Sequence, residues 1–409
     1  MPLAIRHVTG RCVRGTTLGA TLFLAAITSA PAQQAPGVTD TTIKIGQTVP
    51  YSGPASVSGA NGVADVAFTK SINDQGGING RKIELQSLDD AFSPPKTIEQ
   101  TRALVEQEQV AFIYRSIGTA TQVAISKYLN DRKVPQLFIG SSASAWNDPV
   151  NHHYSMGGAI SYEMEAAIYA RYAVSAKPNA KMAVLYQNDD LGKDFYSGLK
   201  KALGDKAEKY IIKDASLQVT DPTVDSQIVT LQDSGADVLF VFATVRPTSQ
   251  AIRKAYDIGW KPMIFIINNA NTVAGTLKPA GLDKSVGVVS GTYVKDPFDP
   301  QWKNDPGVVA WNAFMDKYLP AADKTDIVNV LSPTIGSMLK QTLTQAGNDL
   351  SRENILKQAT NLNGVTSPML LPGITYNTTP TDYRPLKQLQ LARFDGERWV
   401  RFGDVISGE

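Results

Sequence analysis

Two loops rich in glycine, serine and threonine contain the residues of this sequence that are best suited to binding chemistry. One covers residues 116–121 (SIGTAT) and the other covers residues 141–146 (SSASAW). Each follows an apolar, strand-like segment and leads toward a helical pattern, so hydroxyls and free backbone N–H groups gather where strands end. Such groups bind a carboxylate or another small polar head group. We therefore predict a binding cleft lined by these loops.

Catalytic machinery is scarce in the same sequence. His152 and His153 are adjacent, so their side chains point apart and do not suit a shared metal site. Residues 140–144 (GSSAS) resemble the G-x-S-x-G nucleophile elbow only as far as Ser144, which stands in place of the last glycine. Neither of the two common glycine-rich nucleotide-binding loops is present. We predict a protein that is not an enzyme, with no cofactor and no bound metal.

Composition and charge narrow the class of protein further. The chain has 409 residues, of which 43% are hydrophobic and 19% charged. These values are typical of a soluble globular protein and exclude collagen-like, coiled-coil and disordered chains. The length predicts two or three domains, or two lobes of one chain. The 40 basic and 38 acidic side chains give a net charge of +2, which argues against nucleic acid as a partner.

Residues 1–32 have the pattern of a cleaved secretory signal peptide. A basic stretch with three arginines precedes the mostly apolar residues 16–28, and residues 30–32 (APA) supply the small side chains of a cleavage site. The apolar run is shorter than the roughly 20 residues that span a bilayer. Removal of the segment also removes Cys12, the only cysteine, and leaves 37 basic and 38 acidic side chains. We predict a periplasmic mature chain that begins near Gln33, without disulfides or a lipid anchor.

Beyond that segment, patterns of strand period alternate with patterns of helical period. Apolar and polar residues alternate at 42–49, whereas the apolar runs at 238–242 and 263–267 are typical of strands buried on both faces. Strands separated by helices form parallel sheets that helices cover on both sides, so we predict two open α/β sheets. The predicted strands are 42–49, 81–88, 110–115, 134–140, 181–186, 210–215, 237–243 and 263–267, with a terminal hairpin of 388–394 and 398–406. The predicted helices are 63–73, 94–108, 119–131, 162–175, 191–203, 225–233 and 248–258, followed by a mainly helical region at 306–361.

Four segments of this pattern carry a family resemblance. They are residues 42–53 (TIKIGQTVPYSG), 72–83 (INDQGGINGRKI), 88–90 (LDD) and 185–192 (LYQNDDLG). Together they resemble the solute-binding proteins of ABC importers of the branched-chain amino acid, or leucine-binding, type. The GGING segment followed by Arg-Lys-Ile is the most specific, and the resemblance covers about residues 43–399.

The resemblance implies a type I periplasmic-binding-protein fold, in which two doubly wound α/β lobes are joined by a hinge of three crossings. Lobe 1 would comprise residues 33–157 and 291–363. Lobe 2 would comprise residues 158–290 and 364–409. The ligand would lie between the lobes, with the loops at 116–119 and 141–144 around its carboxylate.

This sequence also departs from the amino-acid binders of the family. Asn268 and Asn269 stand where those proteins place an acid for the ligand ammonium, Ser58 stands where a tyrosine is often found, and a second expected tyrosine is missing near Leu191. Arg115 and Arg246 sit at strand ends and are candidates to attract an anion. These departures favour a carboxylate without an α-ammonium, such as an aromatic or fatty acid, while a branched-chain or hydrophobic amino acid stays open. The complete predicted ligand-binding set is Ser58, Arg115, Ser116, Ile117, Gly118, Thr119, Ser141, Ser142, Ala143, Ser144, Trp146, Tyr162, Leu191, Thr244, Arg246, Asn268 and Phe298, with Trp146, Tyr162 and Phe298 as apolar walls.

The function implied by this resemblance is transport. A monomeric periplasmic protein would capture a small ligand between its lobes, close about the hinge and deliver the ligand to the membrane permease of an ABC importer. The alternative is the ligand-sensing module of a receptor or of an amide-type regulator with the same fold, which we would expect to carry a membrane span or a signalling domain.

Overall fold

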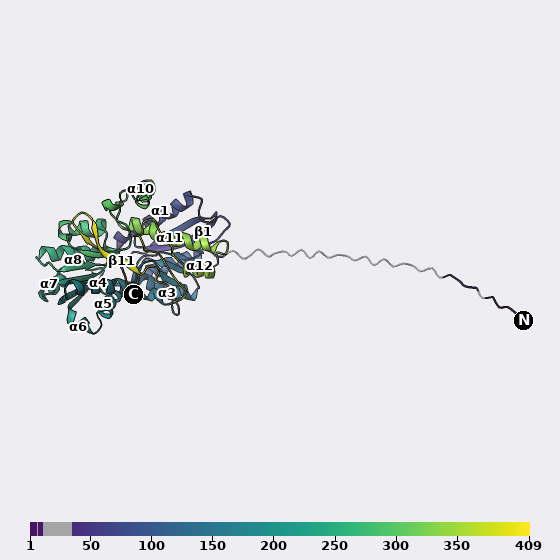
Figure 1. Cartoon of the computed structure of the whole chain (residues 1–409), viewed down its shortest axis with the longest axis horizontal. Helices are drawn as coiled ribbons and strands as arrows, with labels where there is room; N and C mark the ends of the chain where they lie inside the picture. The colour runs from purple at the N-terminus through teal and green to yellow at the C-terminus, as the bar shows by residue number, and fades with distance from the viewer. Residues whose placement is uncertain (6, 11–34) are drawn as a thin grey trace. The chain divides into compact units, whose positions relative to one another are not determined.

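Strands and helices alternate along the chain and build two separate sheets. The computed structural model describes residues 1–5, 7–10 and 35–409, so most of the predicted signal peptide lies outside the described residues. Residues 35–409 form one compact unit. Figure 1 shows helices α4 to α8 gathered around one sheet, and α1, α3, α11 and α12 around the other. Among the described residues, no helix is long and apolar enough to cross a membrane.

The first sheet has five parallel strands in the order β2-β1-β3-β4-β5. Its two longest strands pair in register from Thr42 opposite Lys82 to Val49 opposite Asp89. The strands are β1 (Thr42–Val49), β2 (Lys82–Asp89), β3 (Ile113–Tyr114), β4 (Gln136–Ile139) and β5 (Ser155–Gly157).

The second sheet has seven strands in the order β12-β11-β10-β9-β8-β6-β7. Strands β6 to β10 pair in parallel, whereas β11 pairs antiparallel with both β10 and β12. The apolar strand β8 is buried along its whole length, as expected for a strand covered on both faces. The strands are β6 (Met182–Gln187), β7 (Ile211–Leu217), β8 (Val238–Phe242), β9 (Met263–Ile266), β10 (Val289–Thr292), β11 (Gln388–Phe394) and β12 (Trp399–Ser407).

The chain passes between the two α/β layers three times within the described residues. It leaves the first sheet after β5 and enters α4, which packs on α5. It returns after β10 to α10 and α11, which pack on α1, and it passes back after α12 to β11. The helices are α1 (Ala60–Asp74), α2 (Pro94–Arg102), α3 (Thr119–Asp131), α4 (Tyr162–Ala176), α5 (Asp190–Leu203), α6 (Ala207–Tyr210), α7 (Asp225–Asp233), α8 (Val245–Asp257), α9 (Lys278–Ala280), α10 (Pro306–Tyr318), α11 (Val328–Ala346) and α12 (Arg352–Ala359).

Two predicted elements end earlier than their sequence patterns indicated. The strand predicted at 110–115 forms β-sheet pairs only at Ile113–Tyr114. It ends there because Arg115 adopts a positive φ of 44°, which bends the chain out of the strand. The helix predicted at 94–108 is α-helical only to Arg102, and Ala103–Gln107 continue as a π-helix.

Candidate ligand-binding site

A cavity of about 90 Å³ lies where the strands of both sheets end. It receives residues that follow β1 to β4 of the first sheet and β6, β8, β9 and β10 of the second sheet. This is the crevice outside the carboxyl ends of parallel strands where open α/β sheets place their ligands. We call it the cleft. Its lining is Ser58, Asn61, Phe92, Arg115, Ile117, Gly118, Thr119, Ile139, Gly140, Ser141, Ser142, Gly158, Ala159, Tyr162, Leu191, Thr244, Val245, Ile267, Asn269, Tyr293, Val328, Leu331 and Ile335.

Hydroxyl groups cluster on the first-sheet side of the cleft. The Thr119 and Ser141 side chains form a hydrogen bond of 2.8 Å, and the Tyr162 hydroxyl lies 3.1 Å from Thr119 Oγ1. Trp146 Nε1 donates to Ser141 Oγ at 3.0 Å, so Ser141 is already engaged. Ser142 differs, because its buried Oγ has no hydrogen-bond partner among the described residues. The Ser142 hydroxyl is therefore available to a ligand, and leaving it unpaired would be costly.

Gly118 brings the start of α3 close to this cluster. It has a φ of 112°, and a Cβ at this position would lie 2.4 Å from Thr121 Oγ1 and 2.8 Å from Phe92 Cε2. Glycine adopts this conformation without a steric penalty, whereas residues with a side chain do not. Because residue 118 is a glycine, the first turn of α3 can lie close to the cleft.

The second-sheet side of the cleft is mostly apolar. Leu191 lies at the start of α5, where the carboxylate of Asp189 accepts its backbone N–H at 3.1 Å and so caps the helix. Thr244 directs its hydroxyl to Gln187 Oε1 at 2.9 Å rather than leaving it free. Tyr162 stacks on Phe195 with 4.3 Å between ring centroids, which holds that ring in the wall of the cleft. A ligand in the cleft would therefore meet hydroxyls on one side and aliphatic groups on the other.

Arg115 lines the cleft but is already paired. Its Nη1 donates to both carboxylate oxygens of Asp65, at 2.8 and 2.7 Å, and to Ser332 Oγ at 3.0 Å. The Arg115 and Asp65 side chains are only 3% and 0% exposed. The positive charge that the sequence offered for an anionic ligand is thus neutralised by a buried carboxylate.

Asn268 lies behind the cleft and not on its surface. Its backbone N–H donates to Glu165 Oε1 at 2.7 Å, and its side-chain amide donates to Glu165 Oε2. Burial raises the pKa of Glu165 to about 7, although hydrogen bonds from Tyr169 and Asn268 partly oppose that rise. Asn269, the next residue, lines the cleft. Among the described residues no Asp or Glu lines the cleft, so nothing there matches a ligand ammonium.

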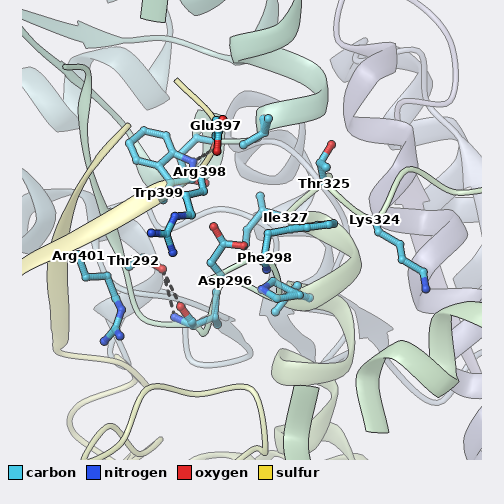
Figure 2. A pocket seen from close by; sticks show the side chains of 15 residues that line it. Thr292, Asp296, Phe298, Lys324, Thr325, Ile327, Glu397, Arg398, Trp399 and Arg401 are labelled. Atoms are coloured by element: carbon cyan, nitrogen blue, oxygen red, sulfur yellow. Dashed lines mark hydrogen bonds between the residues drawn. The ribbon is translucent and has the colours of Figure 1, made fainter. Parts of the chain in front are cut away.

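The remaining predicted site residues lie outside the cleft lining. Arg246 is exposed and donates to the Pro222 carbonyl, so it does not provide charge inside the cleft. Ser116 Oγ accepts the backbone N–H of Thr48, and Phe298 lines a separate cavity (Figure 2). The complete outside set is Ser116, Ala143, Ser144, Trp146, Arg246, Asn268 and Phe298, and the predicted residues that do line the cleft are Ser58, Arg115, Ile117, Gly118, Thr119, Ser141, Ser142, Tyr162, Leu191 and Thr244.

Sequence reasoning missed one wall of the cleft. Val328, Leu331 and Ile335 project from α11 at helical spacing and close the cleft from the side of the crossings. Their apolar stripe was visible in the sequence, but a stripe alone does not tell which surface it faces. Tyr293, which follows β10, was also missed.

The sequence and the fold match those of known binding proteins. Residues 42–398 match the family model described as periplasmic binding protein, and the chain belongs to this family. Its two doubly wound α/β lobes form the type I fold, and the leucine-binding resemblance is confirmed. A curated relative, the Leu/Ile/Val-binding protein homolog 7 of Brucella abortus (strain 2308), is 24% identical over 261 residues. That match covers 60% of this chain and 62% of the relative's length.

Solved structures share the same architecture. A branched chain amino acid ABC transporter from Thermus thermophilus with bound valine aligns with a TM-score of 0.80 at 15% identity, covering 90% of this chain and 97% of that one. A fatty acid ABC transporter substrate-binding protein from Thermomonospora curvata aligns with a TM-score of 0.74 at 19% identity, covering 92% and 95%. A possible leucine/isoleucine/valine-binding protein from Rhodopirellula baltica SH 1 aligns with a TM-score of 0.76 at 19% identity, covering 91% and 98%. The family and fold are those of extracytoplasmic substrate-binding proteins.

Proposed function

We propose that this protein binds a short aliphatic carboxylate in the cleft and delivers it to the membrane permease of an ABC importer. Signal-peptide cleavage near Ala32 would release a monomeric protein into the periplasm. Residues 33–157 with 291–363 would form one lobe, and residues 158–290 with 364–409 would form the other. Intact-mass measurement of the secreted protein would test the cleavage, since retention of residues 1–32 would contradict it.

The charge of the cleft carries the argument for the ligand class. No acid lines the cleft among the described residues, and the carboxyl of Glu165 lies behind Asn268 with a pKa raised to about 7 by burial. A buried ammonium without a carboxylate partner would lose its hydration without compensation. A carboxylate group, in contrast, finds the unpartnered Ser142 hydroxyl and the N-terminal end of α3 on the first-sheet side.

The size of the cleft argues for a short ligand. Its volume of about 90 Å³ is smaller than the roughly 150 Å³ of an apolar cavity that holds benzene. Leu191, Val245 and Ile267 offer aliphatic contacts around that space. Among the carboxylates that the sequence left open, the aliphatic ones fit this arrangement better than the aromatic ones.

Alanine and propanoate test this proposal directly, because they differ only in the α-ammonium and both are smaller than benzene. We expect calorimetry on the mature protein to show at least ten-fold tighter binding of propanoate. Ser142→Ala should weaken that binding about ten-fold, the scale of one charge-assisted hydrogen bond. Ser226→Ala on the exposed face of α7 is the matched control and should leave binding unchanged. Tighter binding of alanine, or equal binding of propanoate to the Ser142→Ala variant, would overturn the proposal.

A further inference from the structure

A second and larger cavity lies at the crossing that follows β10. Its volume is about 280 Å³, and among the described residues its lining shares no residue with the cleft. The crossing itself contributes Val294 and the segment from Asp296 to Phe298. Ile327, just before α11, lies on one side and Trp399 on the other (Figure 2), and Val330 and Asn271 also line the cavity. We call it the crossing cavity.

The walls of the crossing cavity suit an apolar body. Val294, Val330 and Trp399 are buried side chains that face it, and Val273 and Ile327 add further aliphatic surface. Phe298 is 49% exposed. The volume exceeds the roughly 150 Å³ that accommodates benzene, so an aromatic ring with a short chain fits.

The cations that line the crossing cavity, within the described part of the chain, are all paired with carboxylates outside its lining. Arg398 Nη1 lies 3.1 Å and Arg401 Nη2 3.7 Å from the carboxylate of Asp299. Lys324 Nζ lies 2.6 Å from Asp316 Oδ1, and Figure 2 shows its side chain pointing away from the other labelled residues. Arg398 and Lys324 are therefore poorly placed to hold an anion in the cavity. Arg401 donates to Gln390 and Gln301 as well, while its buried Nε has no hydrogen-bond partner among the described residues.

The acids at the crossing cavity, in contrast, have no ion pairs among the described residues. The Asp296 carboxylate accepts the backbone N–H of Phe298 at 2.9 Å and also that of Trp399. Burial raises the pKa of Asp296, although these hydrogen bonds and the charge of Arg398 lower it. Figure 2 shows this carboxylate projecting among the labelled lining residues. Glu397 is exposed on the turn between β11 and β12. Among the described charged residues that line the cavity, only the two acids lack an ion-pair partner.

The side-chain amide of Asn271 is a second, independent indication of a ligand. Asn271 is 6% exposed and lines the cavity, and its amide nitrogen donates to the Gly291 carbonyl at 3.1 Å. Its Oδ1 has no hydrogen-bond partner within residues 35–409 or the described start of the chain. Buried polar atoms are nearly always satisfied, so this oxygen calls for a donor. In the described structure, no side chain donates a hydrogen bond to Asn271 Oδ1 or to the Asp296 carboxylate.

We propose that the crossing cavity is a second ligand site, which takes a primary amine carried on an aromatic body. The ammonium donates to Asp296 and Asn271, while the ring packs against the aliphatic walls and Phe298. A cation beside aromatic faces gains further stabilisation there. This site is separate from the cleft, and its ligand has the opposite charge.

Three compounds that share a phenylethyl group and differ in the charge of the attached group test the charge preference of the site. 2-Phenylethylamine, 2-phenylethanol and 3-phenylpropanoate are titrated into the mature protein by calorimetry. We expect the amine to bind at least ten-fold more tightly than the alcohol, and the acid to bind most weakly of the three. No detectable binding of the amine at millimolar concentration, or tighter binding of the acid, would overturn the proposal.

Four variants locate the binding. Asp296→Asn should weaken amine binding about ten-fold or more, as loss of a charge-assisted hydrogen bond does. Glu397→Gln, at an exposed position that does not endanger folding, should weaken it about two-fold. Asp404→Asn, which removes an exposed charge elsewhere on β12, and Ser142→Ala in the cleft should have no effect. Binding that is unchanged by both Asp296→Asn and Glu397→Gln, or lost in Ser142→Ala, would place the amine elsewhere and refute the site.

Discussion

Arg115 and Asp65 form the most buried ion pair among the described residues. Removal of one partner leaves the other charge buried without compensation, which is far more costly than loss of an exposed pair. We expect Asp65→Ala to lower the free energy of unfolding by about 3–5 kcal/mol. Urea denaturation of the mature protein would measure this change.

An exposed pair provides the control for Asp65. Lys127 and Asp131 lie one turn apart on α3 with side chains 86% and 63% exposed. Lys127→Ala should cost about 0.5 kcal/mol or less. Equal losses in Asp65→Ala and Lys127→Ala would show that burial of the Arg115 pair has no energetic consequence.

Glu165 makes the stability of the protein depend on pH. Burial raises its pKa to about 7, against 4.5 for an unperturbed glutamate, so the folded state holds the proton more tightly than the unfolded state. The free energy of unfolding therefore falls as pH rises from about 4.5 to about 7. Across this pH range we expect the free energy of unfolding of the wild type to fall by about 3 kcal/mol relative to that of Glu165→Gln. Urea denaturation at several pH values would measure this difference. A flat Glu165 comparison would show that the carboxyl is ionised throughout this range.

At the scale of the element, the start of α3 depends on backbone conformation. Gly118 has positive φ and also faces Thr121 and Phe92 at distances too short for a Cβ. We expect Gly118→Ala to destabilise the protein by more than the roughly 1–2 kcal/mol of left-handed strain alone and to abolish binding of the cleft ligand. Denaturation and calorimetry on the same variant would measure both effects.

Gly347→Ala is the control that distinguishes backbone strain from steric crowding by a Cβ. Gly347 follows α11 with a φ of 61°, and a Cβ added there would have no described atom within 4 Å beyond its immediate neighbours. Gly347→Ala should therefore show the conformational strain alone, with ligand binding intact. A loss of stability in Gly118→Ala no larger than that in Gly347→Ala would refute the role of crowding.

At the scale of the whole molecule, one contact joins the two α/β layers across the cleft opening. Asp194 of α5 accepts the backbone N–H of Ser144 at 2.8 Å and its hydroxyl at 2.6 Å. Burial raises the pKa of Asp194 despite these hydrogen bonds. Since Ser144 follows β4 of the first sheet and α5 packs against the second, the contact links the two layers.

Loss of this contact should shift the population toward an open arrangement. We expect Asp194→Asn to weaken binding of the cleft ligand about five-fold and to increase the radius of gyration in small-angle scattering. Asp404→Asn removes an exposed charge on β12 and should change neither quantity. An unchanged radius and affinity in Asp194→Asn would show that closure does not depend on this contact.

The sequence alone determined the family and the order of most elements, but the strands β5 and β10 were not predicted. Strand and helix periods, the cap Asp189 before α5 and the start of α3 at Thr119 are signals that lie within a few neighbouring residues. The two glycine- and serine-rich loops also marked the first-sheet side of the cleft, because chain segments after parallel strands meet at one edge of a sheet. Local chemistry was sufficient for these conclusions.

Only the tertiary structure decided which side chains are free to act. Arg115 finds Asp65 from 50 residues away, and Asn268 finds Glu165 from 103 residues away, so no local pattern could show that these groups are engaged. Phe298 lines the crossing cavity and not the cleft, because the chain leaves the second sheet after β10 and turns toward α10. Charge compensation and the assignment of side chains to cavities depend on contacts between distant segments, and these exist only once the lobes and their crossings have formed.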